Sequence, residues 1–201
     1  MKHISIGDPV VVDSLVNELG EYRITSKGLD DKVGVFVVTE VLERLSRLEL
    51  KNVKVFGCAC TQEEVGGDGA WIASKRINPD FSIDYDVTFA TDDGYASEKE
   101  WGDIKLGSGA AIAHGADKTH GFVKAIKKVC DENNLPYQPF SVHGGTNTGK
   151  IRKAASDCQT ALISIPQRNM HTQVEVCDYR DIESAVNITV ATILKLDQQL
   201  G

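Results

Sequence analysis

Two adjacent carboxylates, Glu63 and Glu64, follow an apolar run over residues 53–60. The run predicts a buried strand, and the glycine-rich residues after the acids predict a turn into a helix. Open α/β sheets carry their chemistry at the carboxyl ends of the strands, where both acids would lie. Neighbouring carboxylates repel each other unless a cation or a proton relieves the charge. The pair therefore suits a metal ligand beside a general base, although an ordinary solvated turn can carry the same dipeptide.

A second acid pair, Asp30 and Asp31, opens a predicted helix of about four turns, in which Val33, Val37 and Val41 recur at helical spacing. Capping the helix and interacting with its dipole requires only one acid. The other acid is then left to be explained. A carboxylate at such a strand-to-helix junction can bridge two cations with its two oxygens.

Asp86 and His171 lie at two further predicted strand ends. Asp86 falls in an alternating strand expected over residues 81–90, and a buried carboxylate is costly unless it is paired or bound to a metal. His171 follows a strand expected to stop at Pro166, although a lone histidine more often has a structural role. With the two acid pairs, these hard oxygens and one imidazole suit zinc, cobalt or manganese. Hydrolysis needs this combination: a metal-bound water of lowered pKa and a carboxylate to take its proton.

Two glycine-containing turns are candidates for ligand binding. Gly144 and Gly145 follow a strand expected over residues 139–142 and could offer backbone N–H groups to a ligand, as well as forming an ordinary tight turn. Residues 106–112 have glycines spaced as in a phosphate loop, but they lack its Lys-Ser/Thr ending and the third glycine of a dinucleotide fingerprint. Close backbone packing is the expected role of this second segment.

The composition narrows the classes of protein. The 201 residues are 41% hydrophobic and carry a net charge of −7, which predicts one domain over residues 1–201 and argues against a nucleic-acid partner. Five cysteines without a CxxC spacing indicate reduced thiols and a cytoplasmic protein, with Cys58 and Cys60 buried on one face of a strand. No signal-peptide pattern and no apolar window of about 20 residues is present, so no membrane partner is expected.

The remaining patterns predict the elements that position these groups. A short edge strand is expected over residues 10–12, after Pro9. Helices are expected from residue 69 to just before Pro79, over residues 119–133, and from Asp178 and Asp181 to about residue 200. Residues 91–104 are polar and broken by glycines, which predicts a surface loop.

Five segments resemble, in this order, the tetrahedral (TET), glutamyl and deblocking aminopeptidases, which are cytosolic dinuclear metallopeptidases. The resemblance implies a three-layer α/β/α fold with a central, mostly parallel mixed sheet, as in zinc aminopeptidases, of which residues 1–201 would be the C-terminal portion. It also implies a peptide substrate, two Zn²⁺ or Co²⁺ ions per chain and a homo-oligomer. The segments are residues 27–34 (KGLDDKVG), 62–66 (QEEVG), 86–88 (DVT), 143–149 (HGGTNTG) and 165–172 (IPQRNMHT).

The resemblance also implies roles for single residues. Asp30 would bridge two metal ions, Glu64 and His171 would complete one site, and Asp86 would belong to the other. Glu63 would be the general base that deprotonates the bridging water. Asp31 would support this geometry through a cis peptide bond to Asp30. The residues expected to line the substrate cleft are Gly144, Gly145, Thr146, Asn147 and Arg168.

The chain departs from the pattern of this family in two respects. Relatives carry an earlier segment with a metal-binding histidine and an inserted dimerisation domain, and this chain is expected to begin just after that insertion. His3 and His143 are not convincing substitutes, so one ion instead of two is expected if the absent histidine is decisive. Asn147 stands where relatives usually have Asp.

Three readings of function remain open on these grounds. The first is a metal-dependent aminopeptidase, and the second is a non-catalytic remnant or a subunit that needs a complementing N-terminal chain. Glycoside hydrolysis by two carboxylates is a distant third.

Overall fold

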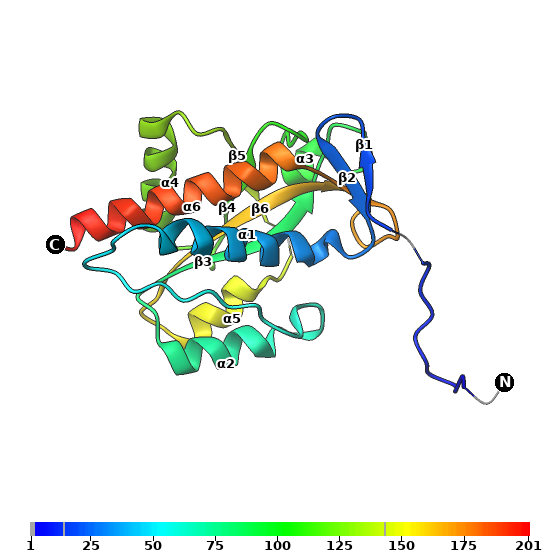
Figure 1. The fold of residues 1–201 in the computed structure, drawn as a ribbon, viewed down its shortest axis with the longest axis horizontal. Helices are drawn as coiled ribbons and strands as arrows, with labels where there is room; N and C mark the ends of the chain where they lie inside the picture. The colour runs from blue at the N-terminus through cyan, green and yellow to red at the C-terminus, as the bar shows by residue number, and fades with distance from the viewer. Residues whose placement is uncertain (1–2, 14, 143) are drawn as a thin grey trace.

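The computed structural model describes residues 3–13, 15–142 and 144–201. Within these residues, one seven-stranded mixed sheet forms the centre of the molecule (Figure 1). Its strands run in the order β1 (Asn17–Leu19), β2 (Arg23–Ser26), β7 (Glu175–Asp178), β6 (Gln159–Arg168), β4 (Ala110–His114) and β5 (Tyr137–Ser141), and β3 (Phe81–Phe89) pairs with β6. The two longest ladders, β3 with β6 and β4 with β5, are parallel, and the other pairs are antiparallel.

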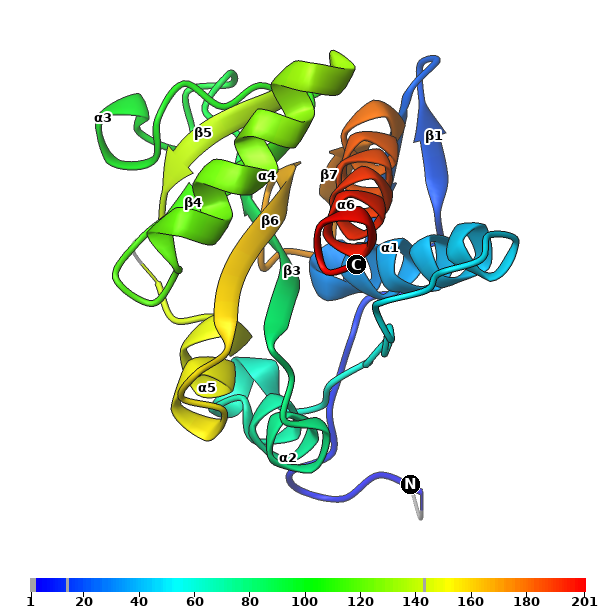
Figure 2. The same cartoon turned by 90° about the vertical axis from the view of Figure 1, so that its left-hand side faces the viewer.

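Helices cover the sheet on both faces, which confirms the predicted three layers. One layer holds α1 (Leu29–Ser46), α4 (His120–Asn133) and α6 (Tyr179–Gln199), and the other holds α2 (Asp68–Ile77) and α5 (Asn147–Ala154) (Figures 1 and 2). A one-turn helix, α3 (Glu98–Trp101), interrupts the loop after β3.

The long helices form where the apolar spacing predicts them. In α1, Val33, Val37, Val41 and Leu45 are each at most 5% exposed and form a single buried stripe. At the start of α6, the Asp178 side chain accepts a hydrogen bond from the Arg180 backbone N–H, as an N-cap should.

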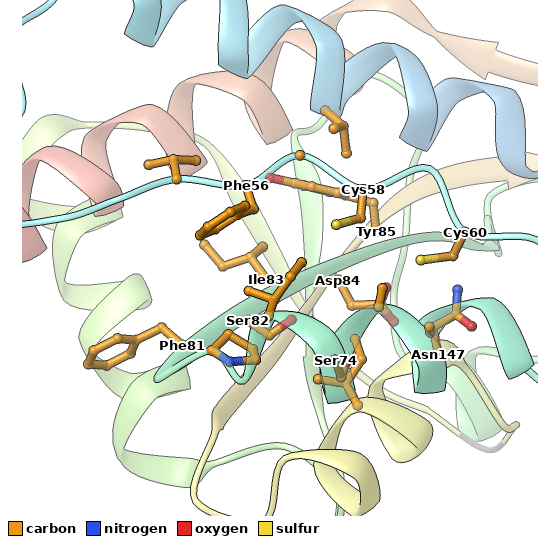
Figure 3. A pocket seen from close by; sticks show the side chains of 18 of the residues that line it. Phe56, Cys58, Cys60, Ser74, Phe81, Ser82, Ile83, Asp84, Tyr85 and Asn147 are labelled. Atoms are coloured by element: carbon orange, nitrogen blue, oxygen red, sulfur yellow. The ribbon is translucent and has the colours of Figure 1, made fainter.

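Residues 53–60 do not form the predicted strand. They run as a nearly straight segment between α1 and β3, without a ladder to any described residue (Figure 3). Phe56 is 53% exposed, Cys58 is exposed and Cys60 is half-buried, so the predicted burial of Cys58 is also wrong. A strand is stabilised by a neighbouring strand, and no described strand lies beside this segment.

The segment is nevertheless held at its start and along its length. The carboxylate of Asp197, near the end of α6, accepts the backbone N–H groups of Lys51, Asn52 and Val53 at 2.6–3.2 Å. A Cβ atom on Gly57 would come within 2.4 Å of the Leu42 side chain, so the segment packs directly on α1. It is therefore tied to the helical layer and not to the sheet.

Two other predictions about strands are wrong. Residues 10–12 form no strand and are 61–92% exposed, because no described strand pairs with them. Strand β6 continues through Pro166 to Arg168, and Pro166 lies opposite Thr88 in the parallel ladder. Proline removes only one ladder donor, and Pro166 lies between the part of β6 that pairs with β4 and the part that pairs with β7.

The glycines before β4 confirm the expected close packing. A Cβ on Gly109 would lie 2.4 Å from the Pro136 carbonyl oxygen, and the φ of this glycine is +102°. The buried Asp181 carboxylate of α6 accepts the backbone N–H groups of Gly107 and Gly109, each at 2.7 Å. These bonds tie the start of α6 to the loop before β4.

Candidate metal centre

Three of the predicted ligands lie together. One ligand atom each from Asp30, Glu64 and His171 can be chosen so that all three lie within 4.8 Å of one another. The His171 Nε2 atom is 3.0 Å from Asp30 Oδ2 and 3.9 Å from Glu64 Oε2. The Asp30 side chain is only 8% exposed, whereas those of Glu64 and His171 are open to solvent. The group therefore has one buried acid and two accessible partners.

Each ligand comes from a different part of the chain. Asp30 lies at the start of α1, directly after β2, and Glu64 lies in the short helix η1 (Glu63–Val65) that follows the 53–60 segment. His171 lies in the turn from β6 to β7, where its φ of 62° is left-handed. This turn aims the imidazole at Asp30 in a way that sequence spacing does not indicate.

Sequence reasoning missed a residue that links two of these ligands. The Glu175 carboxylate accepts the backbone N–H of Asp30 at 3.2 Å and that of His171 at 3.1 Å. Glu175 is 2% exposed, so the carboxylate has little contact with water. The sequence did offer one signal for Glu175, because it is an acid next to the apolar residues of a strand, and a buried acid is costly unless it has a partner. The same argument selects Asp86.

Glu63, the predicted general base, lies beside this group. Burial raises the pKa of its carboxyl group, and repulsion from Glu64 and then Asp30 raises it further. For the same reasons, burial followed by repulsion from Glu64 raises the pKa of Asp30 to about 6. The site therefore holds more negative charge than it can accommodate without a proton or a cation.

Asp31 is joined to Asp30 by a cis peptide bond, as the resemblance implies. Its carboxylate accepts the backbone N–H of Gly34 at 2.9 Å, and burial raises its pKa to about 8. A Cβ atom on Gly34 would lie 2.2 Å from Asp31 Oδ2. The helix therefore needs a glycine at this position to leave room for the acid.

Two further acids lie on β3. Burial raises the pKa of Asp86 to about 9, with Asp31 as the largest repulsive neighbour, and Asp86 is not one of the three clustered ligands. Asp84, which sequence reasoning missed, accepts a hydrogen bond from Thr148 Oγ1 at 2.9 Å. Burial raises the pKa of Asp84 to about 7. Asp84 and Asp86 are two residues apart on β3, so their side chains point to the same face of the sheet.

A cavity of about 1060 Å³ adjoins the acids. Asp30, Asp31, Glu63, Glu64 and Asp84 are among its lining residues. The others include apolar side chains of α1, α2 and β3 and polar ones such as Lys54, Asp80 and Gln159. Figure 3 shows Asp84 and the two cysteines of the 53–60 segment around this space. The acids are thus reached from the interior of the molecule as well as from its surface.

Among the predicted substrate residues, Asn147 has the clearest relation to the cavity. Asn147 lines it, and its side-chain oxygen is buried without a hydrogen-bond partner among the described residues. Thr146 caps α5 by accepting the Thr148 backbone N–H. Gly144, Gly145 and Thr146 lie in the loop before α5 and do not line the cavity. His143, the first residue of this motif, lies outside the described residues.

Arg168 also lies outside the cavity lining, and its guanidinium is already paired. It donates to Asp92 at 2.8 Å and 2.9 Å, and Asp93 lies 3.8 Å away. This pairing keeps the pKa of Asp92 below its usual value despite partial burial. Arg168 therefore anchors the loop after β3.

The donor set fits a divalent cation. Carboxylate oxygens and an imidazole nitrogen, here within 4.8 Å of one another, are typical ligands of zinc and related ions. The pKa values of Asp30, Asp31 and Asp86 are raised, and a cation bound beside these acids would favour their ionised forms.

None of the helices in the described part of the chain is both long and apolar enough to cross a membrane.

The chain resembles aminopeptidases in sequence and structure. A putative aminopeptidase from Acetivibrio thermocellus is 33% identical over 200 residues, which cover 96% of this chain and 58% of that protein. An aminopeptidase from the archaeon Desulfurococcus kamchatkensis superposes with a TM-score of 0.82 at 36% identity, covering 90% of this chain and 51% of that one. A TET aminopeptidase from a marine sediment archaeon of the Thaumarchaeota gives a TM-score of 0.87 at 25% identity, covering 98% and 58%.

The chain therefore spans little more than half the length of the proteins it matches. The family model described as M42 glutamyl aminopeptidase matches residues 1–188, nearly the whole of this sequence. With the α/β fold shared by the structural relatives, this match establishes that the chain belongs to the M42 glutamyl aminopeptidase family.

Proposed function

We propose that this chain is the metal-binding part of an aminopeptidase that hydrolyses N-terminal residues from peptides. The observation that carries the proposal is the convergence of Asp30, Glu64 and His171, which are distant in sequence, within 4.8 Å of one another. Zn²⁺ or Co²⁺ is the ion we expect, because the donors are carboxylate oxygens and an imidazole nitrogen. When bound, the ion would lower the pKa of a water molecule so that hydroxide is available near neutral pH.

The residues of the site would have different roles. Asp30, Glu64 and His171 would hold one ion, and Asp30 and Asp86 would hold a second where two are bound. Glu63 is the proposed general base, because its raised pKa suits it to accept a proton from the attacking water. Asp31 would act as a positioning residue, since its hydrogen bond to Gly34 fixes the start of α1 beside Asp30.

The residues around α5 would bind the substrate. The unpartnered side-chain oxygen of Asn147 can accept a hydrogen bond from the N-terminal amine of a peptide. Gly144, Gly145 and Thr146 would line the outer part of the cleft. Arg168 would shape its rim through the ion pair with Asp92 rather than by binding substrate alone.

Two glutamates in consecutive positions allow a sharp test. Glu64→Gln should weaken Zn²⁺ or Co²⁺ binding measured by calorimetry, whereas Glu63→Gln should keep the ion and lose hydrolysis of amino-acid p-nitroanilides. Glu49, which is exposed and does not line the cavity, provides a Glu49→Gln control. Unchanged ion binding in Glu64→Gln would refute the ligand assignment.

A second candidate is a subunit that needs a complementing chain to complete its site. One observation favours it: Asp86 lies outside the three-ligand group found among the described residues. Release of N-terminal residues by the lone chain with added Zn²⁺ or Co²⁺ would reject this candidate. Activity only after a complementing chain is added would support it.

We also propose a cytoplasmic location and a homo-oligomer. All five cysteines are free thiols in the structure, as expected in a reducing compartment. The side chains of Ile4, Ile6 and Val10 are 79–108% exposed, and self-association would cover such apolar residues. The mass of the purified chain in light scattering tests the oligomer.

A further inference from the structure

A lysine of helix α4 lies beside a histidine at the end of the neighbouring strand β4 (Figure 2). The Lys127 Nζ atom is 2.5 Å from Nε2 of His114, the last residue of β4. At this separation the ring nitrogen accepts a hydrogen bond from the amine, which requires a neutral imidazole. Burial, and then the charges of Lys127 and His120, lower the pKa of His114, so the neutral ring is the expected form near pH 7.

The surroundings of the Lys127 amine favour its uncharged form. The side chain is half-buried, and its Nζ atom lies 5.9 Å from the centre of the Tyr137 ring. Lys127 forms no ion pair with any described carboxylate, whereas Nζ of the next residue, Lys128, lies 3.7 Å from Glu132. Burial lowers the pKa of Lys127, although Cys130 and Asp131 act in the opposite direction. A larger share of this amine is therefore free near neutral pH than of a solvated lysine.

The two side chains together have the parts of an activated nucleophile. A free amine can attack a carbonyl carbon, and a neutral imidazole within hydrogen-bond reach can take the proton that the amine must lose. His114 is exposed, so the pair can be reached from solvent. The exposed basic residues Lys124 and Lys128 lie on the same helix, and their charges favour an anionic reagent.

We propose that Lys127 is a site of acylation by activated, anionic acyl donors, such as acyl phosphates and acyl thioesters, with His114 as the base. The Lys127 Nζ atom forms a bond to the acyl carbon, and the bond from that carbon to the phosphate oxygen or the thioester sulfur breaks. Phosphate or thiolate leaves, and the proton of the amine passes to His114 Nε2 and then to water. The product is an uncharged amide, which ends the attraction between the ammonium group and the Tyr137 ring.

This site is separate from the candidate metal centre. None of His114, Lys127 and Tyr137 lines the cavity beside the acids or belongs to the group of Asp30, Glu64 and His171. The inference therefore holds whether or not the protein is an aminopeptidase.

The test compares two adjacent lysines in the unsubstituted chain. The chain is incubated with acetyl phosphate and, separately, with acetyl coenzyme A at about pH 7.5, and the initial rate of acetylation of each lysine is measured by peptide mass spectrometry. Lys127 should react about tenfold or more faster than Lys128 with at least one donor. The Lys128 side chain is 75% exposed, so access alone predicts the reverse order. Lys127 no faster than Lys128 with both donors would overturn the proposal.

Two exposed histidines provide a matched pair of variants. In His114→Gln, the amide can still accept a hydrogen bond but cannot take a proton, so acetylation of Lys127 should slow by about tenfold or more while that of Lys128 is unchanged. His120→Gln should change the Lys127 rate by less than about twofold, since His120 makes no printed contact with the amine. Equal effects of the two substitutions, or a Lys127 rate that His114→Gln leaves unchanged, would overturn the role of His114. Urea unfolding of both variants checks that each is folded, and the ratio of the two lysine rates in the unsubstituted chain tests the nucleophile without any variant.

Discussion

Gly34→Ala should destabilise this protein, although alanine favours helices. In the interior of an exposed helix the same substitution stabilises by about 1 kcal/mol. Here the new Cβ would lie 2.2 Å from Asp31 Oδ2, so that the carboxylate has to move by about 1 Å to restore an ordinary contact distance. That movement breaks the 2.9 Å hydrogen bond from the Gly34 backbone N–H to Asp31.

The expected magnitude follows from these opposing effects. Burial raises the pKa of Asp31 to about 8, so its carboxyl group is mostly protonated at pH 7 and the Gly34 N–H bonds to a neutral group. A buried acceptor left without its donor costs about 1–3 kcal/mol. After subtracting the gain in helix propensity of about 1 kcal/mol, we expect the free energy of unfolding to fall by up to about 2 kcal/mol.

The chain offers a control with the same chemical change. Gly121 lies in the first turn of α4, and a Cβ there would meet nothing within 4 Å. Gly121→Ala should therefore stabilise by up to about 1 kcal/mol. Urea unfolding of the two metal-free variants at pH 7 measures both values. If Gly34→Ala matched or exceeded the stability of Gly121→Ala, the packing of Asp31 over Gly34 would be refuted.

Three further predictions concern the acids. Glu175→Gln replaces an acceptor that holds the backbone of two proposed ligands, so the affinity for Zn²⁺ in calorimetry should fall by about tenfold or more, with Glu49→Gln unchanged. The raised pKa values of the buried acids mean that the folded state binds protons that the unfolded state releases, so the stability of the metal-free protein should fall as the pH rises from about 4 to 9. Asp84, with a pKa of about 7, contributes to this loss of stability between about pH 4 and 7. In Asp84→Asn, the free energy of unfolding should therefore depend less on pH in that range, and an unchanged pH dependence would contradict the burial of this acid. Asp181→Asn keeps one acceptor oxygen for two backbone N–H donors, so urea unfolding should show a loss of about 1–3 kcal/mol, and an unchanged midpoint would speak against those bonds.

The helices were predictable because their signal is local. The buried stripe of α1 and the N-cap of α6 can be read from a few consecutive residues. Residues 53–60 show the opposite case: their pattern indicates a strand, but whether a strand forms depends on a neighbour that the local sequence does not contain. Pro166 was misjudged for a related reason, because its cost depends on which edge of β6 is paired.

The candidate site, like the fold, could be predicted only in part from the sequence. Asp30, Glu64 and His171 lie together as the resemblance implies, although the strand expected before Glu64 does not form. Glu175 was missed because a single acid in a strand gives no indication of what it binds, and its two backbone partners come from segments remote in sequence. The pairing of Arg168 with Asp92 was missed for the same reason.

The anchoring of residues 51–53 by Asp197 has a mechanical consequence. Three hydrogen bonds fix the beginning of the segment to the end of α6, whereas its far end leads into Glu63 and Glu64. Near that far end, the Gly69 backbone N–H at the start of α2 donates a hydrogen bond to the Thr61 carbonyl oxygen, so the segment is fixed at both ends. The position of Glu64 relative to Asp30 therefore depends on how α6 and α2 hold this segment, as well as on α1, which carries Asp30.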